Sequence, residues 1–153
     1  MKAIEYLTRA KRLDEQINNK LHQIACLRSM AAKVDASGAR AGGGQYPNPD
    51  RLQNAVLRIV EAEKALDRDI DRLMEIKMEI GETIAEVRDM NQRTVLEKRY
   101  LCFMNGREIA EEMHYTGRWI RHFLAEGIRA VQEILDRKEE GETVRKPLRA
   151  SEG

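Results

Sequence analysis

Long apolar runs, aromatic side chains and cysteines are all scarce in this sequence of 153 residues. It contains no run of about 18 apolar residues, so we expect no membrane span, and its first residues lack the apolar stretch of a signal peptide. Aromatic residues make up only 5% of the chain, whereas charged residues make up 35%. This mix is typical of long solvated helices and not of a thick globular core.

Cysteine and histidine do not indicate a metal site. Cys26 and Cys102 both fall in helical patterns, with no Cys or His at ligand spacing nearby. We interpret the chain as a reduced, cytoplasmic protein whose two thiols serve packing. It contains no Ser/His/Asp or Cys/His arrangement, and its carboxylates lie on solvated helix faces, so we expect neither an enzyme nor a bound cofactor.

Two stretches have the apolar periodicity of long amphipathic helices. The first, residues 2–34, contains no Pro or Gly and predicts a helix of about 30 residues. The second begins near Asp50, a good N-cap residue, and its stripe ends at Val87. The stripes comprise Ala3, Tyr6, Leu7, Ala10, Leu13, Ile17, Leu21, Ile24, Leu27, Ala31 and Val34, then Leu52, Val56, Ile59, Leu66, Ile70, Leu73, Ile80, Ile84 and Val87.

The segment 35–50 between these stretches contains four glycines and two prolines. It cannot continue a helix, and it lacks the preceding strand and the Lys-Ser/Thr pair of a phosphate-binding P-loop. We interpret it as a connector that lets the two helices form an antiparallel hairpin over residues 1–92. Glu63 and Lys77 fall at seam positions of the second helix, where they either pair across the seam or mark an imperfect contact.

The two helices differ in the sign of their charge. Residues 1–34 carry seven basic and three acidic side chains, a balance of +4, whereas residues 51–92 carry seven and ten, a balance of −3. Opposite signs favour pairing, although each exposed pair contributes little. Each stripe is wider than one partner helix covers, so two helices alone leave apolar edges exposed. We therefore expect the hairpin to pack on the C-terminal domain, on a second copy of the chain, or on both, and we favour self-association as a homodimer.

Residues 93–138 predict a small domain of three short helices that form a helix-turn-helix. The first helix covers residues 93–101 and directs three side chains into a core: Val95, Leu96 and Tyr100. Beyond residue 138 the sequence is charged and has little apolar periodicity, so residues 139–153 are expected to be a disordered tail.

Capping residues mark the other two helices of this domain. Asn105 and Glu108 form a capping-box-like pair at the start of a helix over residues 106–113. A turn at residues 114–115 follows, and Thr116 caps the third helix. The second helix directs inward Ile109, Ala110 and Met113.

The third helix has an apolar face and, in its N-terminal half, an outward polar face. The apolar face comprises Ile120, Phe123, Leu124, Ile128, Val131 and Leu135, and the outward face comprises Gly117, Arg118, Arg121, His122 and Ala125. An arginine in this half of a helix can pair bidentately with guanine in a DNA groove. With Arg107, the outward residues make up the predicted DNA-contacting set. We expect Trp119 to pack against the first short helix, the alternative being an indole N–H contact with a phosphate.

Three phrases in this segment carry a resemblance to a known module: Arg99-Tyr100, EIAEEM at 108–113, and RWIRHFLAEGIRAV after Thr116. They resemble the region 4 helix-turn-helix of bacterial sigma-70 factors. Over about residues 4–135 the chain resembles a family of small phage and prophage proteins of unknown function with sigma-region-4-like C-termini, related to phage late-gene regulators of the ArpU type.

The resemblance implies roles for particular residues. Arg118, Arg121 and His122 occupy positions that contact promoter DNA in sigma factors, while Ile109, Ala110 and Ile120 occupy core positions. Gly117 stands where a contacting side chain is often found. Regions equivalent to sigma domain 2 are missing, so the chain is not a complete sigma factor.

The sequence thus predicts an all-α protein, in which a long antiparallel helical hairpin precedes a sigma-region-4-like domain. We expect a regulator that binds double-stranded promoter DNA in a bacterial host, with host RNA polymerase as a further partner. Two alternatives stay open. Small terminase subunits, which package DNA, also combine a helix-turn-helix with a helical oligomerisation hairpin. A protein-interaction module without DNA binding would fit the balance of only +2 over residues 93–138.

Overall fold

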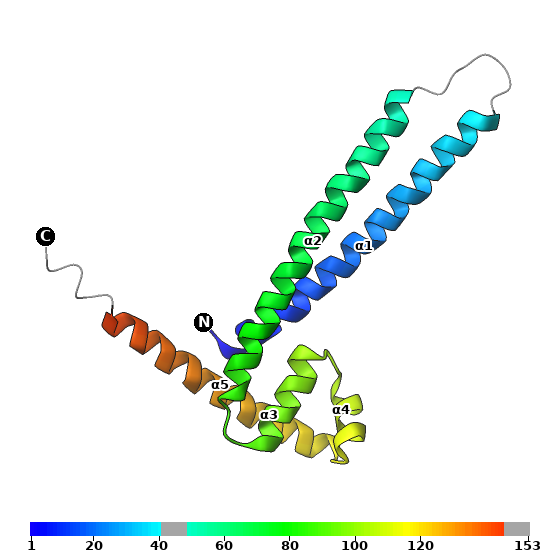
Figure 1. Cartoon of the computed structure of the whole chain (residues 1–153). Helices are drawn as coiled ribbons and strands as arrows, with labels where there is room; N and C mark the ends of the chain where they lie inside the picture. The colour runs from blue at the N-terminus through cyan, green and yellow to red at the C-terminus, as the bar shows by residue number, and fades with distance from the viewer. Residues whose placement is uncertain (41–48, 146–153) are drawn as a thin grey trace, which may run out of the picture. The chain divides into compact units, whose positions relative to one another are not determined.

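The computed structural model describes residues 1–40 and 49–145, and every regular element in these ranges is a helix (Figure 1). The protein is all-α over these ranges, as the sequence predicts. None of the helices described here combines the length and apolarity needed to cross a membrane. The elements are α1 (Ala3–Arg40), α2 (Pro49–Ala85), α3 (Met90–Leu96), the π-helical turn η1 (Glu97–Leu101), α4 (Gly106–Met113) and α5 (Gly117–Arg145).

Contacts between residues divide the chain into two compact units. Unit 1 comprises Met1–Lys11 and Glu75–Gly153, and unit 2 comprises Arg12–Met74. Because α1 and α2 continue through these divisions, both long helices contribute residues to both units.

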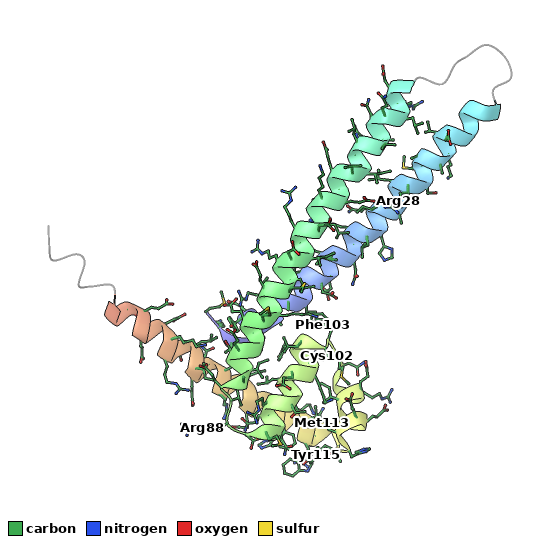
Figure 2. All side chains as sticks on the ribbon, in the orientation of Figure 1. Arg28, Arg88, Cys102, Phe103, Met113 and Tyr115 are labelled. Carbon is green, nitrogen blue, oxygen red and sulfur yellow. The ribbon has the colours of Figure 1, made fainter. Side chains whose placement is uncertain are left out.

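In unit 2, α1 and α2 lie side by side and run in opposite directions (Figure 1). Lys20 of α1 forms an ion pair with Asp69 of α2, and Arg28, labelled in Figure 2, forms one with Glu63. Residue numbers rise along one helix as they fall along the other, which defines the antiparallel register. Glu63 therefore pairs across the seam. The core of this unit comprises Ile17, Ile24 and Leu66, with Leu13, Ile59, Ala62 and Leu73 packed against it.

Apolar edges of both stripes remain exposed in unit 2, as their width predicts. Leu21 of α1 and Val56 and Ile70 of α2 fall on the predicted stripes but lie open to solvent. A single partner helix covers only the centre of a broad stripe, so residues at its margin have nothing to pack against.

Both long helices are longer than predicted at the ends that flank the connector: α1 ends later in the sequence, and α2 begins earlier. The helix α1 continues past the expected end at residue 34 to Arg40, and α2 begins at Pro49. Asp50 therefore lies in the first turn of α2 and is not its N-cap, because proline is well suited to the first helical position. Residues 41–48 of the predicted connector lie outside the described residues.

The prediction that the two thiols serve packing fails. Cys26 and Cys102 are exposed free thiols, so neither serves packing; Cys26 is two residues after Ile24 and therefore points away from the face that Ile24 buries. Lys77, the second polar seam residue of α2, forms no ion pair with α1 in the described part of the chain, which fits the alternative that it marks an imperfect contact. Its ammonium lies 4.5 Å from the ring centroid of Phe103.

In unit 1, hydrogen bonds connect the start of α1 to the end of α2 and to α5. The backbone N–H of Ala3 donates to Oε1 of Gln132 at 2.7 Å. The Tyr6 hydroxyl lies 2.8 Å from the hydroxyl of Thr83, and both residues are buried. These hydrogen bonds lie where α1, α2 and α5 meet. They give partners to polar N–H and O–H groups that burial removes from water.

The last helix is longer than the sequence indicated. α5 runs to Arg145, so helix covers residues 139–145 of the expected tail. The three glutamates and Arg145 of this stretch are good helix formers, and the next proline along the chain is Pro147. Residues 146–153 lie outside the described residues.

Candidate nucleic-acid interface

A small buried core holds α3, α4 and α5 together. Val95 of α3, Ile109 of α4 and Ile120 of α5 are each no more than 2% exposed. This core confirms the inward positions predicted from helical spacing. The partly buried side chains packed against it are Met104, Ala110, Met113, Phe123 and Leu124.

The segment before α4 differs from the single helix predicted over residues 93–101. α3 begins at Met90, because Asp89 caps it by accepting a hydrogen bond from the backbone N–H of Gln92 at 2.9 Å. At Glu97 the chain widens into η1, in which the N–H of Cys102 donates to the Glu97 carbonyl at 3.1 Å. This wider turn then leads into Phe103, which has a positive φ of 58°.

Tyr100 and Arg99 stabilise this wide turn. Tyr100 is buried as predicted, and burial raises the pKa of its phenol. The Arg99 guanidinium donates to the carbonyl oxygen of Met104 at 3.1 Å. The hydrogen bond fixes one end of the Arg99 side chain beside the start of α4.

Gly127 allows α5 to approach α3 closely. A Cβ at this position would lie 3.0 Å from Cδ1 of Leu96, and Leu96 is fully buried. The sequence alone gave no sign of this requirement, because one glycine in a helical pattern looks like any other.

The predicted caps and turn around α4 are confirmed. Asn105 caps α4 by accepting from the N–H of Glu108 at 2.9 Å. The helix ends at His114, which adopts a left-handed conformation with φ 60°. Thr116 Oγ1 then accepts from the N–H of Trp119 at 3.4 Å. These contacts fix where α5 begins, and Figure 2 shows Tyr115 at this turn.

All six residues of the predicted DNA-contacting set are exposed, and the structure sorts them into two groups. Arg107, Gly117 and Arg121 line a groove between α4 and α5, together with Arg99. Arg118 and His122 line a separate hollow with Trp119. Ala125 is exposed but lines neither. Sequence reasoning missed Arg99, whose position next to the buried Tyr100 was the available signal.

Three arginines of this surface form no ion pair, although the carboxylate of Glu111 also lines the groove. In the part of the chain that the structure describes, Arg107, Arg118 and Arg121 take part in no ion pair. By contrast, Lys98 pairs with Glu112 on α4, and Arg129 pairs with Glu126 at 3.3 Å. The three unpaired cations therefore remain available to an anionic ligand.

Trp119 does not pack against α3, so that prediction is wrong. It is 53% exposed, with its ring centroid 5.7 Å from those of His122 and Phe123. Phe123 also packs edge-on against Tyr115 at 5.2 Å and belongs to the partly buried set around the core. Because Phe123 takes the place beside the core, Trp119 is left on the outer flank of α5.

Gly117 is not required by packing. A Cβ at this first position of α5 would meet nothing within 4 Å. The surface can therefore accept a side chain there without rearrangement.

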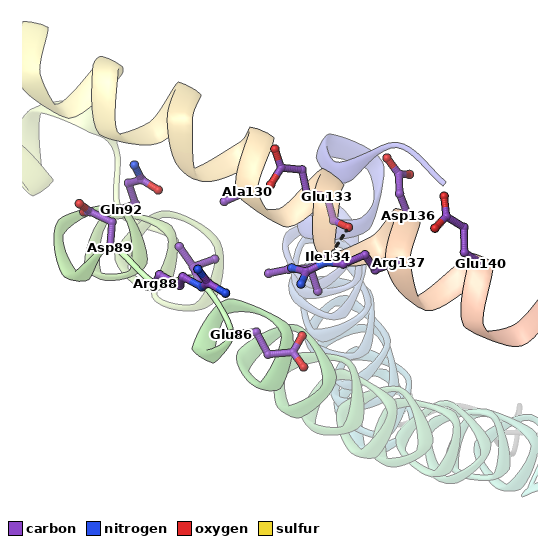
Figure 3. Close-up of a pocket in the computed structure, with 11 residues that line it drawn as sticks. Glu86, Arg88, Asp89, Gln92, Ala130, Glu133, Ile134, Asp136, Arg137 and Glu140 are labelled. Atoms are coloured by element: carbon purple, nitrogen blue, oxygen red, sulfur yellow. Dashed lines mark hydrogen bonds between the residues drawn. The ribbon is translucent and has the colours of Figure 1, made fainter.

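A second hollow in unit 1 has the opposite electrostatic character (Figure 3). It is lined by Glu86, Asp89, Glu133, Asp136 and Glu140, with only Arg88 and Arg137 as cations. Arg137 is exposed and donates to the carbonyl oxygen of Glu133, one turn back on α5, at 3.4 Å. Across residues 1–40 and 49–145, no three His, Cys, Asp or Glu side chains are placed to hold a metal ion. An excess of carboxylates repels phosphate, so this hollow is unsuited to nucleic acid.

Comparison with protein-family models, curated proteins and solved structures found no match for the chain. The resemblance to sigma region 4 and to the phage family therefore stays a prediction. Any function has to be inferred from the geometry of this chain itself.

Proposed function

We propose that the protein is a DNA-binding transcription regulator of phage or prophage genes that reads promoter DNA with the N-terminal half of α5. One observation carries the proposal: Arg107, Arg118 and Arg121 are exposed and unpaired around a helix whose opposite face is fixed by a buried core. A rigid helix that presents unpaired arginines fits the major groove in size and in charge.

Within this proposal the residues of α5 and of α4 have different tasks, and the α5 residues come from both hollows. Arg118 and Arg121, on successive turns of α5, reach base edges, where arginine pairs with guanine. Arg107, in the first turn of α4, contacts a phosphate, which the N-terminus of a helix also favours. Ala125, one turn further along α5, contacts a thymine methyl group, and host RNA polymerase is the proposed protein partner.

The test is a titration of the full chain with fragments selected from the phage or prophage genome that encodes it. We expect Arg118→Ala and Arg121→Ala each to cost about 1–3 kcal/mol on a specific site, about fivefold to 150-fold in affinity. Affinity should also fall steeply with salt as phosphate contacts release counterions. Arg137→Ala, in the acidic hollow, is the matched control and should bind like the wild type. Equal binding by all three variants would contradict the assignment of α5.

A protein-interaction module is the second candidate, and the exposure of Trp119 favours it. Trp, Tyr and Arg are the residues that most often dominate protein interfaces, and Tyr115 is exposed close by. Trp119 is the only tryptophan of the chain, so its fluorescence reports on any ligand at this flank. A response to polymerase, with no response to DNA and no retention on DNA at low salt, would support this candidate over the first.

A further inference from the structure

Unit 2 has an apolar face that its own two helices leave uncovered. We define this face by five side chains that are between 38% and 60% exposed: Leu21, Val56, Val60, Ile70 and Met74. A single exposed apolar residue is ordinary, but these five recur along one length of the helix pair.

The four residues on α2 share one side of the helix. At about 100° per residue, positions 56, 60, 70 and 74 fall within an arc of about 80°. The arc lies beside the face that carries Leu66, which packs toward α1. Two acidic residues lie in the same arc: Glu63, which pairs with Arg28 of α1, and Asp67; a polar residue in an apolar helix seam fixes register at some cost in stability.

The helix α1 contributes to the same face. The Lys20–Asp69 ion pair sets the register, so Leu21 lies at the level of Ile70. Leu21 is rotated about the α1 axis away from the residues that contact α2, and the α2 arc is rotated about its own axis in the same sense. In an antiparallel pair, two such rotations lead to the same side of the pair, so Leu21 lies next to the α2 arc. The face therefore spans both helices.

We propose that this face binds a second copy of the chain, so that two copies of unit 2 form a four-helix bundle. The stretch 56–74 is about 27 Å long at 1.5 Å per residue, and two helices are about 20 Å wide. Each copy then contributes about 540 Å² and the pair about 1,100 Å², which reaches the lower limit of specific interfaces. A face that meets its own copy is also self-complementary, as a twofold dimer requires.

The charges of unit 2 favour one arrangement of the two copies. Residues 12–34 carry four basic and two acidic side chains, whereas residues 50–74 carry five basic and six acidic. An arrangement with α1 of one copy over α2 of the other brings opposite signs together. The Arg28–Glu63 pair is satisfied within each copy and leaves no unpaired charge at that point of the seam.

The experiment measures the mass of the full chain in solution, without DNA, over a wide range of concentration by sedimentation or light scattering. We expect a monomer–dimer equilibrium. Val60→Lys and Ile70→Lys should each weaken the dimer by at least about tenfold, because association would bury a lysine. Met30→Lys is the matched control: Met30 is exposed on α1, about half a turn around the helix from Leu21, and this variant should dimerise like the wild type.

Several outcomes would overturn the proposal. These are a wild-type monomer at every concentration, equal weakening by Met30→Lys, and a ring of many copies, which would favour the packaging alternative. Circular dichroism shows whether each variant retains its helices, and a Val60→Ala variant, which adds no charge, should keep the dimer if folding is intact. The inference does not depend on DNA binding, so loss of DNA binding by the α5 variants leaves it standing.

Discussion

In unit 2, two long helices share a core of three buried residues, whereas α3, α4 and α5 of unit 1 surround a core to which every helix contributes. The two regions also leave different surfaces open. Unit 2 exposes apolar side chains along its length, and the start of α5 exposes arginines without carboxylate partners.

The difference shows how helix number governs what remains on the surface. A pair of helices has one contact and covers only part of each apolar stripe, so the remainder stays in solvent. Three helices that cross one another close their core, and most of the side chains that remain outside are polar, with Trp119 and Met90 as exposed apolar exceptions. We propose association for the first surface and DNA binding for the second on these grounds.

The largest expected effect tests the closed core. Ile109→Ala should cost about 2–5 kcal/mol of unfolding free energy, because it leaves a cavity between three helices. Ile4→Ala is the control within unit 1, since Ile4 is 54% exposed, and it should change stability little. The measurement is urea denaturation followed by Trp119 fluorescence. A loss below about 1 kcal/mol for Ile109→Ala would show that this core is not closed.

A smaller effect is expected at the crossing of α3 and α5. Gly127→Val should cost about 1–3 kcal/mol, because its side chain would overlap the buried Leu96. Gly141→Val on the same helix is the control, as a Cβ there meets nothing within 4 Å. Thermal denaturation of both variants gives the comparison. If the two behaved alike, close approach of the helices would not be what requires Gly127.

The smallest effect concerns the ion pairs of unit 2. A double-mutant cycle on Arg28→Ala and Glu63→Ala should give a coupling of about 0.2–1 kcal/mol, because the two side chains are 64% and 40% exposed and solvent screens the pair. High salt should reduce the coupling further. A coupling of several kcal/mol would mean that ion pairs, and not apolar burial, hold these helices together.

Much of this fold could be predicted because its signals are local. Asn105 and Thr116 act through hydrogen bonds to residues three positions away, so the sequence around them is sufficient. Ile109 and Ile120 lie on faces that helical periodicity defines. Some helix boundaries were predicted wrongly, such as the start of α2, which lies at Pro49. Two neighbouring residues can each begin this helix, and local sequence does not decide between them.

The missed features involve residues far apart in the sequence. Trp119 lies between the polar and apolar faces of its helix, and only the packing of Phe123 left it outside. Gly127 is needed because Leu96 lies against it. The contact of Lys77 with Phe103 likewise joins two segments that no local pattern relates.

The sequence by itself determined that the described chain is helical, where α4 begins and ends, and that the predicted DNA-contacting residues of α5 are exposed. Those features follow from periodicity and capping, which act within a few residues. The tertiary structure decided that Arg99 joins Arg107 and Arg121 in one groove, that Trp119 is exposed, and that unit 2 keeps an uncovered apolar face. Each of these features depends on which helices pack together. That packing brings residues far apart in the sequence into contact, and it decides which side chains are buried.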